Sequence, residues 1–101
     1  MNFERIIFTI ITYSGEARSL SMEAIAHAKR KEISKAKKCI EEAVEKLEMA
    51  HREQTHLIHA EAQGEKVEVS LLLIHAQDHL MMAMTVKDLA NELIDIHEKI
   101  S

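Results

Sequence analysis

The stretch LLLIHAQDHLMMAM, residues 71–84, decides the fold, because a helix formed from it is apolar on nearly every side. A helix at the edge of a small monomeric bundle has one face in water and cannot bury so much apolar surface. The excess therefore predicts a partner chain. Three ionisable residues, His75, Asp78 and His79, interrupt the apolar run within five positions.

Composition indicates one all-α domain over residues 1–101. The chain has no proline and two glycines, and 3% of its residues are aromatic, whereas alanine, leucine, isoleucine, glutamate and lysine are common. These residues favour helix over sheet. Apolar side chains recur at three- and four-residue steps, which predicts three helices at about residues 2–29, 32–63 and 66–100.

Charge and cysteine content narrow the class of function. The net charge is −4 and the one basic block is KRK at residues 29–31, so little supports a nucleic-acid-binding role. The single cysteine, Cys39, excludes an intrachain disulfide and fits a reducing compartment, and we expect it to be small and half-buried. The apolar residues 6–11 are too few to span a bilayer or to form a signal peptide. We therefore expect a soluble, cytoplasmic protein.

Local signals mark the ends of the helices and one interruption. Ser34 is a candidate N-cap for the second helix, and Gly64 is placed to end that helix, as glycine often does. Gly15 lies inside the first helix, where glycine costs up to about 1 kcal/mol relative to alanine. It indicates either a close approach of another backbone or a ligand, or a simple kink.

The ionisable residues of the third helix share one face. At about 100° per residue, His75 and His79 are separated by about 40°, and Asp78 lies about 60° from His75 on its other side. Leu71 and Met82 lie on the same face. The three polar side chains therefore form a local cluster on one stripe of the helix.

Three interpretations of this cluster remain open on the residues alone. Each histidine can be a hydrogen-bonded, inert core or interface residue. His75 and His79, at i and i+4, can chelate a transition metal, but the glutamate that follows the first histidine in zinc proteases is missing and no third ligand is identifiable. Alternatively, one neutral imidazole can act as a nucleophile that carries a phosphoryl group, with a polar neighbour holding its other nitrogen.

Residues 64–94, GEKVEVSLLLIHAQDHLMMAMTVKDLANELI, resemble the C-terminal helix of the lactose/cellobiose-type IIA component of the sugar phosphotransferase system (PTS). Residues 6–29, IIFTIITYSGEARSLSMEAIAHAK, are similar to the first helix of that family. The resemblance covers essentially the whole chain. It implies a phosphotransferase component that serves uptake of a disaccharide of the lactose, cellobiose or chitobiose type. It also implies an antiparallel up-and-down three-helix bundle, three copies of which form a homotrimer of nine helices.

The resemblance also implies roles for the cluster. His75 matches the residue that accepts a phosphoryl group from the phosphocarrier HPr and passes it to a cysteine of the IIB component. Asp78 matches the acid that, once from each of three chains, binds one divalent cation, usually Mg²⁺, on the trimer axis. His79 matches the second histidine of the motif, and we expect it only to support His75 as a donor to phosphoryl oxygens.

Physical chemistry agrees with the role of Asp78. Three buried aspartates that converge on an axis repel one another by several kcal/mol, so protons or a metal must neutralise them. Oxygen ligands suit Mg²⁺. Because HPr and IIB must both reach His75, we expect its ring in a surface groove. The alternative function is a degenerate trimeric scaffold or regulatory binding protein without phosphoryl transfer, and the intact HAQDH sequence argues against it.

The remaining histidines indicate no chemistry. His51, His56 and His59 fall on the polar-rich second helix, and His27 and His97 lie near helix ends. We expect solvent-facing or helix-end roles for all of them. One departure from the family concerns the boundary between the first two helices, because KRKEIS contains no glycine where the family commonly has one.

Overall fold

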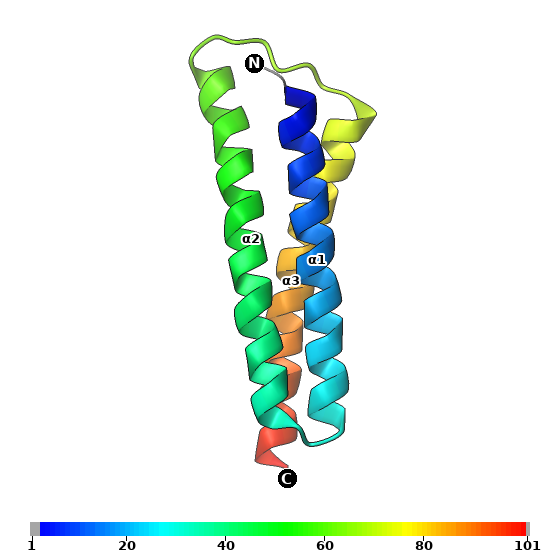
Figure 1. Ribbon diagram of the computed structural model, residues 1–101. Helices are drawn as coiled ribbons and strands as arrows, with labels where there is room; N and C mark the ends of the chain where they lie inside the picture. Colours follow the sequence, from blue (N-terminus) through cyan, green and yellow to red (C-terminus); the bar gives the residue numbers. More distant parts are fainter. Residues whose placement is uncertain (1–2, 101) are drawn as a thin grey trace.

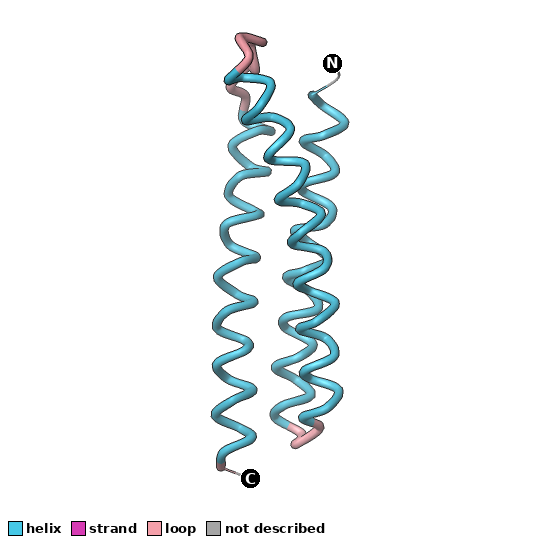
Figure 2. Tube along the Cα trace, turned by 90° about the vertical axis from the view of Figure 1, so that its left-hand side faces the viewer, coloured by secondary structure: helices cyan, strands magenta, loops and turns pink. Residues whose placement is uncertain are grey.

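The computed structural model of the protein describes residues 3–100 and arranges them as three long α-helices (Figure 1). These helices are α1 (Phe3–Lys29), α2 (Ile33–Ala62) and α3 (Leu71–Lys99). They lie side by side in both views and alternate in direction, so α1 and α3 run the same way (Figure 2). The bundle is a rod of 54 × 21 × 16 Å. The predicted all-α, up-and-down three-helix bundle is confirmed.

The third helix begins later than predicted, at Leu71 instead of residue 66. Ser70 is extended and its hydroxyl oxygen accepts a hydrogen bond from the Leu73 N–H at 3.1 Å, so Ser70 is the N-cap. The β-branched Val67 and Val69 precede it in a stretch without helix, which suits their preference for extended backbone. Residue 2, where the prediction began the first helix, and residues 1 and 101 of the predicted domain lie outside the described residues.

The turn from α1 to α2 closes without glycine. Lys31 adopts a left-handed conformation with φ of 62°. Its N–H donates to the Ala28 carbonyl at 3.0 Å, and the Glu32 N–H donates to the His27 carbonyl at 2.9 Å. This pair of bonds is a Schellman motif, in which glycine usually fills the position that lysine fills here. The Ser34 cap prediction is wrong, because Glu32 is the N-cap residue of α2 and its side chain makes no capping bond.

The end of α2 uses the same motif with the usual residue. Gly64 has φ of 92°, its N–H donates to the Glu61 carbonyl at 3.1 Å, and the Glu65 N–H donates to the Ala60 carbonyl at 3.0 Å. The predicted role of Gly64 is therefore confirmed. The following loop, residues 63–70, crosses from the end of α2 to the start of α3 at the end of the bundle where α1 begins (Figure 1).

Gly15 neither interrupts helix α1 nor lies against another backbone of the described chain. Helix α1 continues through it from Phe3 to Lys29. A Cβ atom built on Gly15 would meet nothing within 4 Å, so no neighbouring backbone among residues 3–100 requires glycine there.

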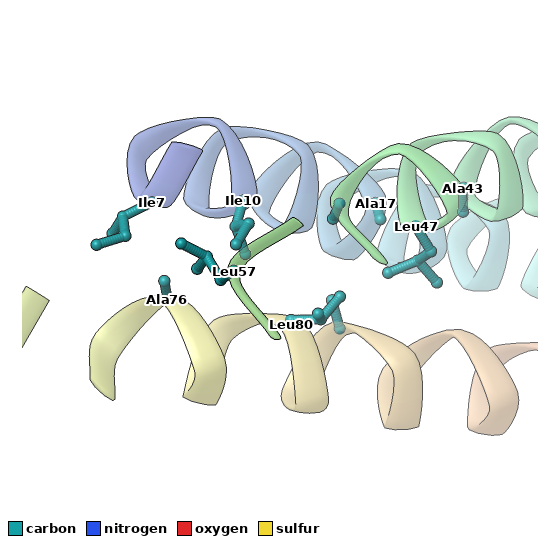
Figure 3. Close-up of a cluster of buried hydrophobic side chains, with 10 residues drawn as sticks. Ile7, Ile10, Ala17, Ala43, Leu47, Leu57, Ala76 and Leu80 are labelled. Carbon is teal, nitrogen blue, oxygen red and sulfur yellow. The ribbon is translucent and has the colours of Figure 1, made fainter. Parts of the chain in front are cut away.

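The core runs the length of the rod and is rich in alanine, which lets the helix backbones approach closely. Figure 3 shows the cluster nearest the start of α1, where Ala76 and Leu80 of α3 point toward side chains of α1 and α2. A second cluster lies at the other end, around Ala28, Ala36 and Ile94. Helix α1 packs against both other helices, whereas α2 and α3 contact one another less.

Helix α3 leaves an apolar stripe in solvent. Leu71 is 83% exposed, and further large apolar side chains stay uncovered along the helix. They are Ile74, Met81, Met82, Leu89, Leu93 and Ile96. The chain alone thus does not bury the apolar surface that the sequence places on this helix. Within residues 3–100, no helix has the length and apolarity that a membrane crossing requires.

Candidate functional site

The site lies on the first turns of α3. The Ser70 cap fixes where the helix begins, and the buried Ala76 and Leu80 fix which side of it faces α1 and α2. His75 is thereby turned to the surface and is exposed, and His79, one turn later, is half-buried. The ring of His75 is therefore accessible from solvent in this chain.

The two imidazoles lie next to one another. Their ring centroids are 5.1 Å apart and the ring planes are inclined by 46°. Among residues 3–100, neither ring has a hydrogen-bond partner, so both nitrogens of His75 are available to a reactant. The polar neighbour that we expected to hold the second nitrogen of the nucleophilic ring is absent from this part of the chain. The single chain therefore leaves the tautomer of His75 free.

Asp78 lies in the middle of the exposed apolar stripe. At about 100° per residue, it points within about 40° of four residues of the stripe. These are Leu71, Met82, Leu89 and Ile96. Asp78 is exposed and makes no hydrogen bond or ion pair with any of residues 3–100. If the stripe packs against other chains, the carboxylate goes with it and needs a neutralising partner there.

The surroundings of Asp78 fit a shared cation. One carboxylate supplies at most two oxygen ligands, whereas Mg²⁺ takes six. Within one turn of Asp78 on the stripe there is no second acidic side chain. The remaining ligands of such an ion would have to come from water or from carboxylates of other chains.

A glutamine pair next to the site could not be found from the sequence. Gln54 of α2 donates from its side-chain nitrogen to the Gln77 side-chain oxygen at 3.0 Å, and so ties α2 to α3. The helical period shows that Gln77 points away from His75, but it does not reveal a partner 23 residues earlier. This bond holds α3 on the side of the helix that faces away from His75.

The remaining histidines agree in part with expectation. His51, His56 and His59 are exposed, as predicted. His27 has the predicted helix-end position, but its side chain is only 17% exposed and its Nδ1 lies 2.8 Å from Glu32 Oε1. This pairing has no signal in the sequence, because it depends on the left-handed conformation of Lys31 in the turn. Cys39 is half-buried, as predicted, and burial raises the pKa of its thiol.

Comparison with known proteins extends these observations. Residues 5–98 match the family described as "PTS system, Lactose/Cellobiose specific IIA subunit". The chain is 55% identical to the lichenan-specific phosphotransferase enzyme IIA component of Bacillus subtilis, with 97% of this chain and 89% of that protein covered.

Solved structures give the same picture. The crystal structure of the PTS cellobiose-specific enzyme IIA from Bacillus anthracis is 50% identical and superposes with a TM-score of 0.96, covering 99% of this chain and 92% of that chain. A solution structure of the IIA(Chitobiose)-HPr complex from the Escherichia coli phosphotransferase system is 38% identical, with a TM-score of 0.83 and coverage of 99% and 97%.

Proposed function

Because the chain belongs to the lactose/cellobiose-specific IIA family of the phosphotransferase system, we propose that His75 is the residue on which it carries a phosphoryl group. Proteins of this family are phosphotransferase components, so the question for this chain is which side chain is loaded. The observation that carries the proposal is the free ring of His75. It is exposed, and neither of its nitrogens is tied to another of residues 3–100.

The transfer has two steps. In the first, the unprotonated nitrogen of His75 attacks the phosphorus of phospho-HPr in line. A bond from this nitrogen to phosphorus forms, the bond from phosphorus to the HPr nitrogen breaks, and the HPr imidazole leaves. In the second step, a cysteine thiolate of IIB attacks the same phosphorus. The sulfur–phosphorus bond forms and His75 departs with its electron pair.

HPr as donor and IIB as acceptor are part of the proposal. A solved relative of this fold is a complex with HPr, which supports the first partner. The second follows from the family's role in passing the group onward. Both must dock at the same ring, and the exposed position of His75 leaves room for each of them in turn. The proposed site of action is the cytoplasm, which the single cysteine fits.

His79 has a supporting role in the proposal. Its ring centroid is 5.1 Å from that of His75, which is close enough for a protonated ring nitrogen to reach an oxygen of a phosphoryl group on His75. Such a charge-assisted hydrogen bond favours the phosphorylated state. His79 is half-buried and therefore less mobile than His75, which suits a positioning residue.

The proposal also includes a homotrimer of nine helices. Three chains pack their α3 stripes around a threefold axis, and the Asp78 carboxylates of the three chains hold one Mg²⁺. The ion supplies positive charge that offsets the mutual repulsion of the carboxylates. The exposed apolar stripe supports this arrangement, because packing it against two copies removes it from water. His75 lies at the edge of the stripe and stays accessible.

The test is phosphoryl transfer in a defined mixture. Purified protein is incubated with phosphoenolpyruvate, enzyme I and HPr, and the phosphoryl group is followed by intact mass and by its lability in acid. We expect one acid-labile group per chain in the unmodified protein, none in His75→Gln, and slower loading in His79→Gln. His59→Gln removes an exposed histidine of α2 and is the matched control. Loading of His75→Gln at the normal level would overturn the assignment.

A further inference from the structure

A second group of potential ligands lies at the other end of the bundle. Glu23 and His27 are one turn apart on α1, and Cys39 faces them from α2. A carboxylate oxygen, an imidazole nitrogen and the sulfur from these residues all lie within 4.8 Å of one another. His75 is level with the first turns of α1, so His27 is about 30 Å away along the rod at 1.5 Å per residue.

The imidazole of His27 is already oriented. Its Nδ1 lies 2.8 Å from Glu32 Oε1. The donor-only Arg30 Nη2 also lies near this nitrogen, at 3.1 Å, but the contact with the carboxylate is shorter and Arg30 is itself paired with that carboxylate. We therefore place the proton on Nδ1, from which it is donated to Glu32. The lone pair is then on Nε2, which lies 3.8 Å from Glu23 Oε1. A carboxylate that accepts from one ring nitrogen while the other faces the ligands is the usual arrangement of a metal-binding histidine.

The turn between the helices holds this arrangement. Lys31, in its left-handed conformation, reverses the chain so that the Glu32 N–H donates to the His27 carbonyl at 2.9 Å. Backbone and side chain of Glu32 therefore both bind His27. The Arg30 Nε donates to the same carboxylate oxygen at 2.9 Å and holds it in place. These hydrogen bonds together lower the pKa of Glu32 to about 2, which keeps it ionised.

We propose that Glu23, His27 and Cys39 bind a divalent transition metal ion of the zinc type. Sulfur, imidazole nitrogen and carboxylate oxygen are the ligand set that Zn²⁺ accepts, whereas Mg²⁺ and Ca²⁺ avoid thiolate. In tetrahedral zinc sites, bonds of 2.0–2.3 Å put neighbouring ligand atoms about 3.3–3.8 Å apart. The group must therefore close by about 1 Å. The exposed Glu23 side chain can rotate to do so.

The charges of the site suit a dication. On binding, the Cys39 thiol loses its proton to solvent and a sulfur–metal bond forms, so the ligands become one thiolate, one carboxylate and one neutral imidazole. Their total charge of −2 balances the ion. Burial, together with the nearby carboxylates of Glu23 and Glu42, raises the pKa of the Cys39 thiol without metal. The surplus negative charge that disfavours the thiolate is what a cation relieves.

The consequence for the protein is a metal clamp between α1 and α2. An ion that binds only the folded state stabilises it according to its concentration and its dissociation constant. This site is separate from Asp78 in position and in chemistry. It does not take part in the proposed phosphoryl transfer, so its failure would leave that proposal untouched.

The test uses Co²⁺ as a spectroscopic probe of the whole protein under a non-thiol reductant. We expect a thiolate-to-cobalt charge-transfer band that saturates at one equivalent per chain and is displaced by Zn²⁺. Cys39→Ser abolishes the band, and Glu32→Gln weakens binding by about 10- to 100-fold, the usual effect of losing a carboxylate that orients a ligand. Asp78→Leu and His59→Gln are controls that keep the band.

The outcomes separate a built site from chance binding. Zn²⁺ should raise the midpoint of thermal unfolding of the unmodified protein but not that of His27→Gln, whose circular dichroism reports whether it is folded. The absence of a charge-transfer band at one equivalent of Co²⁺ would overturn the proposal, as would a band that persists in Cys39→Ser.

Discussion

The two histidine clusters of this molecule use similar residues in opposite ways. On α3, the rings of His75 and His79 lie next to one another, and neither they nor Asp78 make a hydrogen bond or ion pair with any of residues 3–100. At the α1–α2 corner, His27 is held by the Glu32 carboxylate at 2.8 Å, with Arg30 beside it. If His75 is loaded and unloaded as proposed, its reacting nitrogen has to stay free, whereas a ring that binds a metal gains from a partner that holds its other nitrogen.

The difference also concerns where the missing partners come from. The corner gathers its ligands within one chain, from two helices and the turn that joins them. The α3 cluster presents a carboxylate on an apolar stripe, and in the proposed trimer its neutralisation involves other chains. The following predictions test this contrast in order of decreasing effect.

The largest effect is expected from Asp78→Leu. In the unmodified protein, chelation of divalent cations should weaken the trimer by several kcal/mol, because converging carboxylates lose their counter-charge. The leucine variant has no such charges, so it should stay trimeric with or without chelator. Sedimentation velocity measures both states. Monomers of the variant, or indifference of the unmodified trimer to chelation, would contradict the role of Asp78.

Placing a carboxylate next to His75 should remove the difference between the free His75 ring and the paired His27 ring. Leu71 lies one turn before His75 and is 83% exposed, so Leu71→Glu places an acid within reach of the ring. Repulsion between this carboxylate and the phosphoryl oxygens should cost about 1.4 kcal/mol and slow loading about tenfold. Leu71→Gln has nearly the same shape without the charge and should load several times faster. Equal rates for the two variants would show that charge near His75 is unimportant.

Replacing the left-handed Lys31 by glycine should stabilise the turn between α1 and α2. Lys31 is left-handed, which costs an L-residue about 1–2 kcal/mol, whereas glycine adopts this conformation freely but is more flexible when unfolded. Lys31→Gly should therefore raise the free energy of unfolding by about 0.5–1 kcal/mol. Lys38→Gly, inside α2, should lower it by about 1 kcal/mol. Urea unfolding compares the two, and a loss of stability in both would contradict the role assigned to the turn.

The smallest effect is a pH dependence at the corner. The pKa of Glu32 falls from its ordinary value of 4.5 to about 2 in the folded protein, chiefly through its hydrogen bond with His27. A carboxylate with a lowered pKa stabilises the fold above about pH 4.5, and this contribution is lost as the pH falls toward about 2. Glu32→Gln should lack this part of the acid sensitivity, whereas Glu61→Gln should keep it. Thermal unfolding across this range measures both, and parallel curves for Glu32→Gln and the unmodified protein would refute the expectation.

The features that local pattern determines were predictable from the sequence. Apolar period located the three helices, Gly64 marked the end of α2, and the helical wheel put His75, Asp78 and His79 on one stripe. The start of α3 was misplaced because Ser70 was not identified as its cap. The apolar pattern runs on through Val67 and cannot separate a helix from the extended residues before it.

The corner could not be predicted because it depends on contacts between elements. A lysine at a left-handed position has no reliable sequence signal, and without it the pairing of Glu32 with His27 does not follow. The approach of Cys39 to Glu23 depends on the relative rotation of two helices, which periodicity leaves undetermined. Prediction succeeded where one helix carries the whole cluster and failed where a turn assembles it.

The alanines at the helix contacts make the folding stability of the protein dependent on its assembly. The small side chains of Ala76 and Ala83 let α3 pack close to the rest of the bundle, so a single chain buries only a modest apolar area in its core. Unfolding of a single chain therefore exposes little apolar surface. If three chains pack their α3 stripes together, the free energy of unfolding of each chain depends on the protein concentration. For such a protein, dilution shifts the equilibrium toward dissociated chains, which are less stable. Each chain reaches its full stability only above the concentration at which the trimer forms.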